Sequence, residues 1–337
     1  MSVAAKSILK RMVSVVLGSD IVLGRRLRQL AQCDATTILN LHRVDDLEGS
    51  AYEAMKPALF EDLVCWLKGN FRIVTFAELA TLAPSGKPPL ILSFDDGYKD
   101  FIEVVMPILA RHSIRANQNV IPASIESGRP PMNVMLQDFI GTAPVALLGE
   151  MVIPGLARGV GINDRVRYGI RASAALKNRP IAEQKTVFEK LEQYFVRFDG
   201  FRTTAMMTLD EVRQIATEHE IGAHSFEHAS MAVETDDYLR DDLKRCRTYF
   251  EERIESSPRI YAFPNGSCRP GQINHVLAGG FDHVLLVGND WSDVTADSHH
   301  RFGLHAQTLP EAKFRALGSF RGLAIAIDKR SNLGRAT

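Results

Sequence analysis

The sequence lacks long apolar runs, paired cysteines and an excess of charge of either sign. No stretch reaches the roughly 18 apolar residues that a membrane-spanning helix needs, so no span is expected. The four cysteines include no C-x-x-C pair, which argues against a thiolate metal site and against a dense disulfide framework. The 40 basic residues balance the 40 acidic residues, so we expect no nucleic acid as a partner.

What the chain does contain is enough apolar sequence for a large core. It has 337 residues, of which 45% are hydrophobic. Apolar and β-branched runs predict strands at 36–41, 71–74, 90–92, 114–121 and 284–287. Apolar residues at helical spacing predict helices at 60–67, 76–82, 101–109 and 239–254, with a bend at Pro107. Strands that alternate with helices indicate an α/β fold with a largely parallel sheet or barrel.

Residues 122–207 interrupt this alternation with mainly helical segments. We expect a helical insertion in a barrel of residues 36–325, followed by a polar tail at 326–337. Between Met151 and Arg202 basic residues outnumber acidic ones. Such charge would suit a phosphate-bearing substrate, although a solvated helix surface is its commoner meaning. Thr208 and Glu211 form a capping-box pattern that predicts the helix after the insertion.

The N-terminal segment, residues 1–35, is basic and is expected to be helical. It carries six basic residues up to Gln32 against the single acid Asp20. Its apolar stretch is too short for an export signal and no cleavage site follows it, so we expect a cytoplasmic protein. A basic amphipathic segment also suits peripheral contact with the inner face of an anionic membrane, and a solvated helix is the simpler interpretation.

Two polar segments, each after a strand-like run, indicate a metal site. Neighbouring side chains on a strand point to opposite faces, so Asp95 and Asp96 can share a site only where the strand has ended, a break that Gly97 can supply. His224 and His228 are four residues apart, which would place both imidazoles on one side of a helical turn. One aspartate and two histidines leave room for water and substrate, as catalytic zinc sites do.

The Phe-Asp-Asp-Gly and His-Ser-x-x-His segments resemble the first two motifs of the NodB-homology polysaccharide deacetylases, carbohydrate esterase family four. The resemblance implies a distorted (β/α) barrel with its site at the carboxyl ends of the strands. It also implies that Asp95 is the general base and that Asp96, His224 and His228 bind a divalent metal. Zn²⁺ is the expected ion, with Co²⁺ or Ni²⁺ as alternatives.

The family's third motif, an arginine followed by proline, an aromatic residue and glycine, is only partly kept. Ala262 stands near the expected arginine, and Asn265 replaces the aromatic residue. Arg259, Arg269 or Arg301 would have to reach the catalytic aspartate from elsewhere. The residues expected to bind substrate are Tyr98, Phe263, Pro264, Asn265, Gly266, Trp291 and His305.

Two of the predicted positions have alternative interpretations. Trp291 follows an aspartate, as in the family's fourth motif, and is either an apolar wall for the acetyl methyl group or a core residue. The general acid is either His42 or His305. The Leu-His-Arg-Val segment at His42 resembles the aromatic-His-x-Val motif of permuted relatives, whereas the Leu-His pair at His305 does not match the family's fifth motif in register. Histidine titrates near neutrality and so suits protonation of an amine.

The resemblance implies removal of an N-acetyl group from an amino sugar or glycan precursor, in surface polysaccharide biosynthesis. An N-acetylated carbohydrate is therefore the expected partner. A deformylase or another amide hydrolase is one alternative. A catalytically silent carbohydrate-binding protein is the other, but such a protein would be expected to lose its ligands, and this chain keeps all three and the base.

Overall fold

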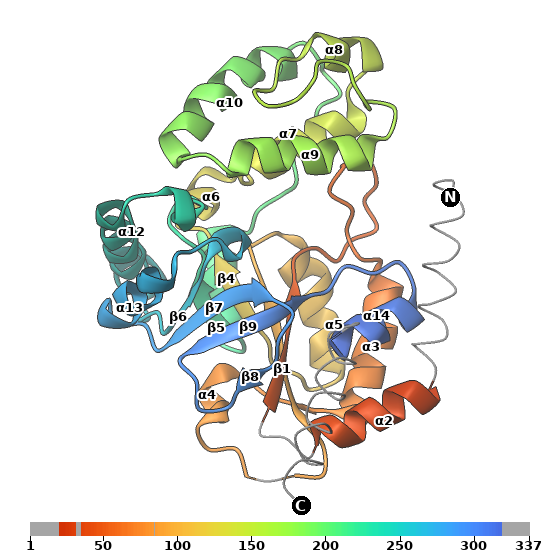
Figure 1. Ribbon diagram of the computed structural model, residues 1–337, viewed down its shortest axis with the longest axis vertical. Helices are drawn as coiled ribbons and strands as arrows, with labels where there is room; N and C mark the ends of the chain where they lie inside the picture. Colours follow the sequence, from red (N-terminus) through yellow and green to blue (C-terminus); the bar gives the residue numbers. More distant parts are fainter. Residues whose placement is uncertain (1–19, 32–34, 84, 319–337) are drawn as a thin grey trace, which may run out of the picture.

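The computed structural model describes residues 20–31, 35–83 and 85–318 (Figure 1). Most of the predicted basic N-terminal segment lies outside these residues, and its described part is helix α2 (Asp20–Leu30). The predicted polar tail at 326–337 lies wholly outside them. No described helix is long and apolar enough to cross a membrane.

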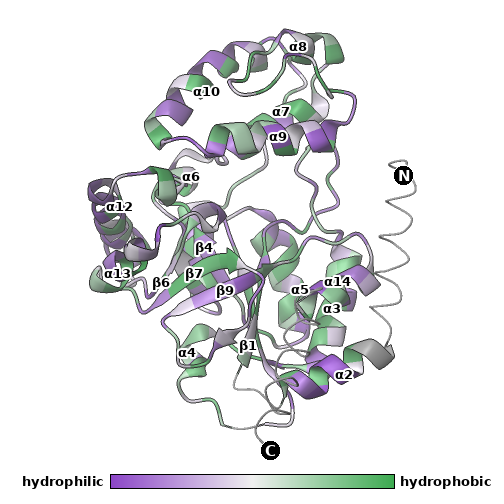
Figure 2. Cartoon of the chain, viewed as in Figure 1, coloured by the Kyte–Doolittle hydropathy of each residue, from purple (hydrophilic) through white to green (hydrophobic). Residues whose placement is uncertain are grey.

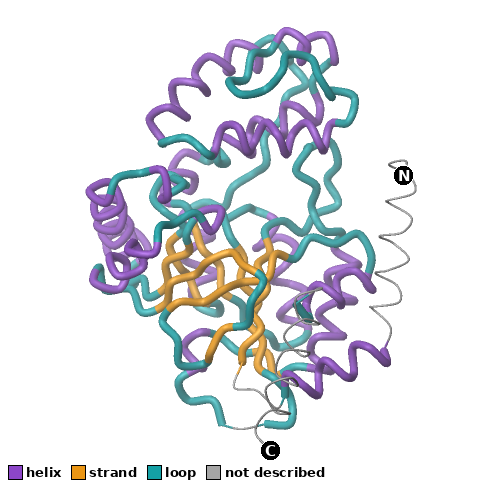
Figure 3. Tube along the Cα trace, in the orientation of Figure 1, coloured by secondary structure: helices purple, strands orange, loops and turns teal. Residues whose placement is uncertain are grey.

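Seven parallel strands close into a barrel, which confirms the predicted fold class (Figure 3). In sheet order they are β3 (Pro89–Phe94), β4 (Asn117–Val120), β5 (Glu220–Ala223), β6 (Ile260–Ala262), β7 (His283–Gly288), β9 (Ser298–Gly303) and β1 (Ala35–Leu41). The barrel closes where β1 pairs with β3, with Ile38 beside Ile91. Two short strands pair with the barrel from outside the ring: β2 (Arg72–Ile73) with β3, and β8 (Ser292–Asp293) with β1.

The two faces of the strands carry different side chains, because successive residues alternate between the inside and the outside of a barrel. Ile38 and Ile91 belong to a small apolar cluster inside one half of the barrel. Leu39 and Leu92 belong to the large cluster between the barrel and its helices. The described helices around the barrel are α3 (Pro57–Asn70), α4 (Phe76–Leu79), α5 (Met106–Arg111), α11 (Leu209–Ala216), α12 (Asp236–Tyr249), α13 (Pro270–Ala278) and α14 (Leu309–Ala316).

The predicted apolar stripes are the faces that pack on the barrel. In α3, Phe60, Leu63, Val64 and Leu67 are all buried. The stripe of α12 continues into a π-helical turn, η3 (Phe250–Ile254). Another π-helical turn, η1 (Phe101–Val105), precedes α5 and its Pro107, which lacks the N–H that a regular helix would use there. The capping box at α11 forms as predicted.

The insertion is a separate helical layer above the barrel (Figure 1). It contains α7 (Met132–Thr142), α8 (Val145–Glu150), α9 (Arg165–Lys177) and α10 (Ile181–Phe195), whereas the preceding helix α6 (Pro122–Ser127) packs on the barrel through Ile125. Its helices enclose their own apolar cluster, which includes Phe139, Tyr168, Leu176 and Leu191. Figure 2 shows hydrophobic and hydrophilic residues alternating along α9 and α10, as expected for helices that bury one face.

The loop between β1 and α3 joins the barrel to this layer. Ala51 in the loop packs in the insertion's apolar cluster, and its N–H donates to the carbonyl oxygen of Gln137 at 3.0 Å. Two helical glycines make this approach possible. A Cβ on Gly141 would lie 1.8 Å from the carbonyl oxygen of Gly49, and a Cβ on Gly169 would lie 2.5 Å from the Cβ of Ala51. The loop between β1 and α3 is therefore held by α7 and α9.

Candidate active site

The two aspartates lie where β3 ends. The Asp95 N–H still donates to the carbonyl oxygen of Leu41 at 3.0 Å, so Asp95 continues the barrel pairing. Asp96 has a φ of 78° and Gly97 a φ of 85°. The break that the sequence suggested at Gly97 therefore begins one residue earlier, at Asp96, and aspartate tolerates the left-handed region better than most residues. As a result both carboxylates reach one site.

The two histidines follow β5, but the expected helical turn between them is wrong. Residues 224–230 form an irregular loop in which Ser225 has a φ of 58° and His228 a φ of 61°. Asp242 of α12 holds this loop, because one of its oxygens accepts hydrogen bonds from the Ser225 hydroxyl and from the Phe226 N–H, both at 2.9 Å. Burial raises the pKa of Asp242, and these hydrogen bonds oppose the rise.

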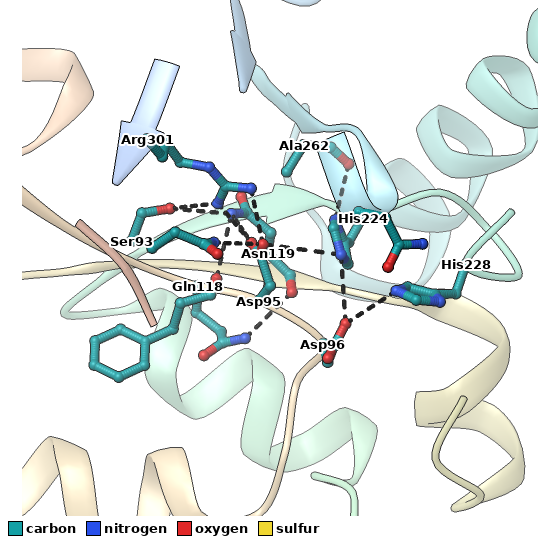
Figure 4. Close-up of polar contacts among 12 residues, drawn as sticks. Ser93, Asp95, Asp96, Gln118, Asn119, His224, His228, Ala262 and Arg301 are labelled. Atoms are coloured by element: carbon teal, nitrogen blue, oxygen red, sulfur yellow. Dashed lines mark hydrogen bonds and ion pairs between the residues drawn. The ribbon is translucent and has the colours of Figure 1, made fainter. Parts of the chain in front are cut away.

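Asp96, His224 and His228 form a candidate metal site (Figure 4). One ligand atom from each lies within 4.8 Å of the other two. Asp96 Oδ1 is 3.4 Å from His224 Nε2 and 3.5 Å from His228 Nε2. One oxygen and two nitrogens in this arrangement match the ligands of catalytic zinc sites, which keep further positions for water and substrate.

The surroundings of these side chains fit a bound cation. Asp96 Oδ1 is buried and has no hydrogen-bond partner among the described residues, a costly state for a charged oxygen unless an ion meets it. Asp96 Oδ2 accepts a hydrogen bond from the Tyr98 hydroxyl at 2.6 Å. His224 Nδ1 lies 2.8 Å from the carbonyl oxygen of Ala262, so this nitrogen carries the proton and Nε2 is left to bind a metal.

Arg301 of β9 forms a buried ion pair with Asp95. The guanidinium donates to both carboxylate oxygens, at 2.7 and 2.8 Å, and Arg301 is 0% exposed. Arg301 thus supplies the charge that the partly kept third motif lacks. Of the other two candidates, Arg259 pairs with Asp282 and Arg269 pairs with Asp236.

Two asparagines complete the hydrogen bonds of Asp95. Asn40 donates to Oδ2 at 2.7 Å and Asn119 donates to Oδ1 at 2.8 Å. Burial on its own would raise the pKa of Asp95, but Arg301 and His224 hold it well below its usual value. Burial likewise acts against the charged form of Asp96, while the neighbouring imidazoles of His224 and His228 lower its pKa. Both carboxylates are therefore ionised at neutral pH.

These residues lie in a pocket of about 440 Å³ between the barrel and the insertion. Seven of the predicted site residues line it: His42, Asp95, Asp96, His224, His228, Asn265 and His305. Its other walls come from α7 and α9 and include Gln137, Ile170 and Lys177. This size is within the usual range for small-ligand pockets.

The structure does not bring the other predicted substrate residues to the pocket wall. Tyr98 is buried behind Asp96. Phe263 and Pro264 are buried, with the Phe263 ring against Tyr261. Gly266 has a φ of 63° and lies against Val287.

Trp291 also lies away from the pocket. Its ring contacts Phe302 with centroids 5.5 Å apart, and it packs on the large apolar cluster. Of the two alternatives for Trp291, this position agrees with a core residue.

The two candidate general acids, His42 and His305, both line the pocket, but their exposure differs. His42 follows β1 and is half-buried, whereas His305 follows β9 and is exposed. Burial lowers the pKa of His42, although the charges of Asp96 and Asp95 raise it.

Sequence reasoning did not identify Asn40, Asn119 or Lys177. Asn40 gave a usable signal, because it is a polar residue near the end of the largely apolar strand β1, whereas Asn119 lies in the polar strand β4. Lys177 was one of the basic residues of the insertion, but nothing singled it out, since it meets the barrel residue Asn265 across 88 positions of sequence.

A parallel barrel with an Asp-His-His set at the carboxyl ends of its strands defines a class of metal-dependent hydrolases. The family model described as polysaccharide deacetylase matches residues 181–281, a range that contains both histidines. No curated protein matches the chain.

Several solved structures share the fold. The Streptococcus pyogenes deacetylase PplD in complex with acetate is 14% identical, with a TM-score of 0.56 over 84% of this chain and 98% of that one. IcaB from Ammonifex degensii is 15% identical, with a TM-score of 0.53 over 85% and 98%. A polysaccharide deacetylase from Bacillus cereus is 13% identical, with a TM-score of 0.54 over 84% and 69%.

The match of residues 181–281 and the shared fold make the chain similar to the polysaccharide deacetylases. This family match and the Asp-His-His set indicate a hydrolase that acts on carbon–nitrogen bonds other than peptide bonds.

Proposed function

We propose that this protein removes the N-acetyl group from an amino sugar in a glycan or glycan precursor. The observation that carries the proposal is the convergence of Asp96, His224 and His228 on the pocket beside the buried Asp95–Arg301 pair. Biosynthesis of a surface polysaccharide is the role that we propose for the reaction.

The three ligands would hold one divalent ion, for which we propose Zn²⁺ because of the two imidazole nitrogens. When bound, such an ion polarises a carbonyl oxygen and lowers the pKa of water from about 16 to about 7. Tyr98 and the carbonyl of Ala262 orient Asp96 and His224 toward it. These contacts fix the ligand atoms before the ion arrives, which favours binding.

Asp95 is the general base in this proposal. Its four hydrogen bonds leave no oxygen free in the structure, but Asn40 lines the pocket. The attacking water would replace the hydrogen bond from Asn40 to Oδ2, which lies 3.9 Å from His224 Nε2. Arg301 keeps the carboxylate ionised and fixed in orientation, so that it is available as a proton acceptor at neutral pH, although its lowered pKa makes it a weaker base.

His42 is the proposed general acid, which gives a proton to the departing amine. Its support is its position at the end of β1, half-buried on the pocket wall, where burial lowers its pKa and the charges of Asp96 and Asp95 oppose that shift. His305 remains the alternative, on a more exposed part of the same wall. Asn265 is the substrate-binding residue that we retain from the third motif.

The cytoplasmic location and the membrane contact of the N-terminal segment remain predictions, because most of that segment lies outside the described residues.

The substrate test is the release of acetate and of formate from free, nucleotide-linked and lipid-linked N-acylated amino sugars. Acetate release from at least one of them is expected. Formate release alone would replace the proposal with a deformylase, and release of neither acid would refute it.

A pair of variants tests the roles of the two aspartates. Asp95→Asn should keep the metal but lose about 10²- to 10⁴-fold in turnover, because it removes the base. Asp96→Asn should weaken metal affinity, because it removes an anionic ligand. Equal metal loss in the two variants, measured by elemental analysis, would contradict this assignment.

A further inference from the structure

The insertion places a lysine in the catalytic pocket. Lys177 is the last residue of α9, is half-buried and lines the pocket together with His228 and Asp96. Its Nζ donates a hydrogen bond to Asn265 Oδ1 at 2.8 Å. The ammonium of the insertion and the third-motif loop of the barrel therefore meet at the pocket wall.

Lys177 differs in its partner from two other cations of the insertion. Lys185 pairs with Glu227 at 2.7 Å, and Arg197 pairs with Glu150 at 2.7 Å. Within residues 20–31, 35–83 and 85–318, no carboxylate lies within ion-pair distance of Lys177, and its described hydrogen-bond acceptor is a neutral amide oxygen. A partly buried ammonium in such a place is only partly compensated.

The acids of the pocket offset this charge only in part: burial lowers the pKa of Lys177, and the charge of Asp96 opposes that shift without cancelling it. Asp95 is neutralised by Arg301, and Asp96 faces the two histidines, where a divalent ion would outweigh its single charge. Glu53, the remaining acid on the wall, is exposed. The pocket therefore combines a metal site with a cation that is only partly compensated, a field that favours an anionic ligand.

We propose that the substrate carries an anionic group, a phosphate or a carboxylate, that pairs with Lys177 while the N-acyl group lies at the Asp96–His224–His228 site. The inference rests on the proposed function and adds a substrate class to it. The anion would replace Asn265 as the main partner of the ammonium. Lys177 is then a residue of substrate specificity, supplied by the insertion rather than by the barrel.

The experiment compares one neutral substrate with its anionic analogues. The substrates are N-acetylglucosamine, its 1-phosphate, its 6-phosphate and the corresponding uronic acid. The variants are Lys177→Gln, which removes the charge but keeps a hydrogen-bonding amide, and Lys177→Arg, which keeps the charge. Lys185→Gln is the matched control, because Lys185 also joins the insertion to the barrel and lies outside the pocket.

The wild-type protein should prefer at least one anionic substrate. Lys177→Gln should raise KM for that substrate about 10- to 100-fold, the usual worth of a charge-assisted hydrogen bond, and should raise KM for the neutral sugar much less. Lys177→Arg should keep most of the preference, and Lys185→Gln should keep all of it. The phosphates and the uronic acid distinguish the two anions.

Three results would overturn the inference. Cleavage of the neutral sugar without any preference for an anion refutes it while the proposed function stands. An equal loss of kcat for neutral and anionic substrates in Lys177→Gln would mean that Lys177 acts on the reacting carbonyl instead. Cleavage of none of the four compounds, together with no acetate release from the nucleotide-linked and lipid-linked sugars, would refute the proposed function as well.

Discussion

Replacement of Arg301 by methionine should destabilise the protein because it leaves Asp95 charged and buried. The pair is fully enclosed, with Arg301 0% and Asp95 2% exposed. Removal of one partner from a buried ion pair costs about 3–5 kcal/mol. Asn40 and Asn119 would still donate to Asp95, so we expect the lower end, about 3 kcal/mol, or about two orders of magnitude in the unfolding constant.

The loss should depend on pH with a definite sign. The pKa of Asp95 in the folded protein lies below its unfolded value, so the pair contributes stability above an unfolded pKa of about 4, which is lost as the pH falls through the folded pKa. Without Arg301, burial raises the pKa of Asp95. Protonation of Asp95 then removes the unpaired buried charge, and the variant loses less stability. The difference between wild type and Arg301→Met should therefore be largest at neutral pH and shrink toward pH 4.

Urea unfolding at several pH values measures this difference. Arg259→Met is the matched control, because Arg259 pairs with Asp282 on the surface, where such a pair contributes at most about 1 kcal/mol. The double variant Asp95→Asn/Arg301→Met should recover part of the loss. A deficit at neutral pH no larger than that of Arg259→Met, or one that grows in acid, would refute the role assigned to the pair.

Two further predictions concern the site. Tyr98→Phe removes the hydroxyl that donates to Asp96 Oδ2 and should weaken metal affinity about 10- to 100-fold by competitive titration. The control Tyr238→Phe removes a buried hydroxyl without a described hydrogen-bond partner and should leave metal affinity unchanged. An equal loss of metal affinity in both variants would show that the effect is not local. His42→Ala should lower kcat about 10²- to 10⁴-fold with little change in KM and remove the alkaline limb of the pH–rate profile. If His305→Ala removes that limb and His42→Ala keeps it, the acid is His305.

The parts of the fold that could be predicted are those in which apolar residues recur with a clear period. Strand β1, strand β3 and helix α3 bury regular apolar faces. Strand β9 was missed because Ser298–Gly303 contains serine, two histidines and an arginine and does not read as an apolar run. Its polar residues His299 and Arg301 are buried inside the barrel, where other strands supply their partners.

The metal ligands could be predicted because they follow strands in short motifs, but their backbone conformation could not. The loop that holds His228 depends on Asp242, which lies on another element. Arg301 was one of three candidates, and only the closed barrel, with β9 beside β1, brings it to Asp95. Contacts between the insertion and the barrel could not be predicted, because they join residues far apart in the sequence and produce no local pattern.

The central claim is that a divalent ion held by Asp96, His224 and His228 is required for hydrolysis of the N-acetyl group. The most direct measurement is acetate release by chelated protein as Zn²⁺ is titrated back, for wild type and for the His224→Ala/His228→Ala double variant. Release from wild type should be abolished by chelation and restored at about one ion per chain, and the double variant should stay inactive at that concentration. Acetate release that survives chelation, or that Zn²⁺ restores equally in the double variant, would contradict the account.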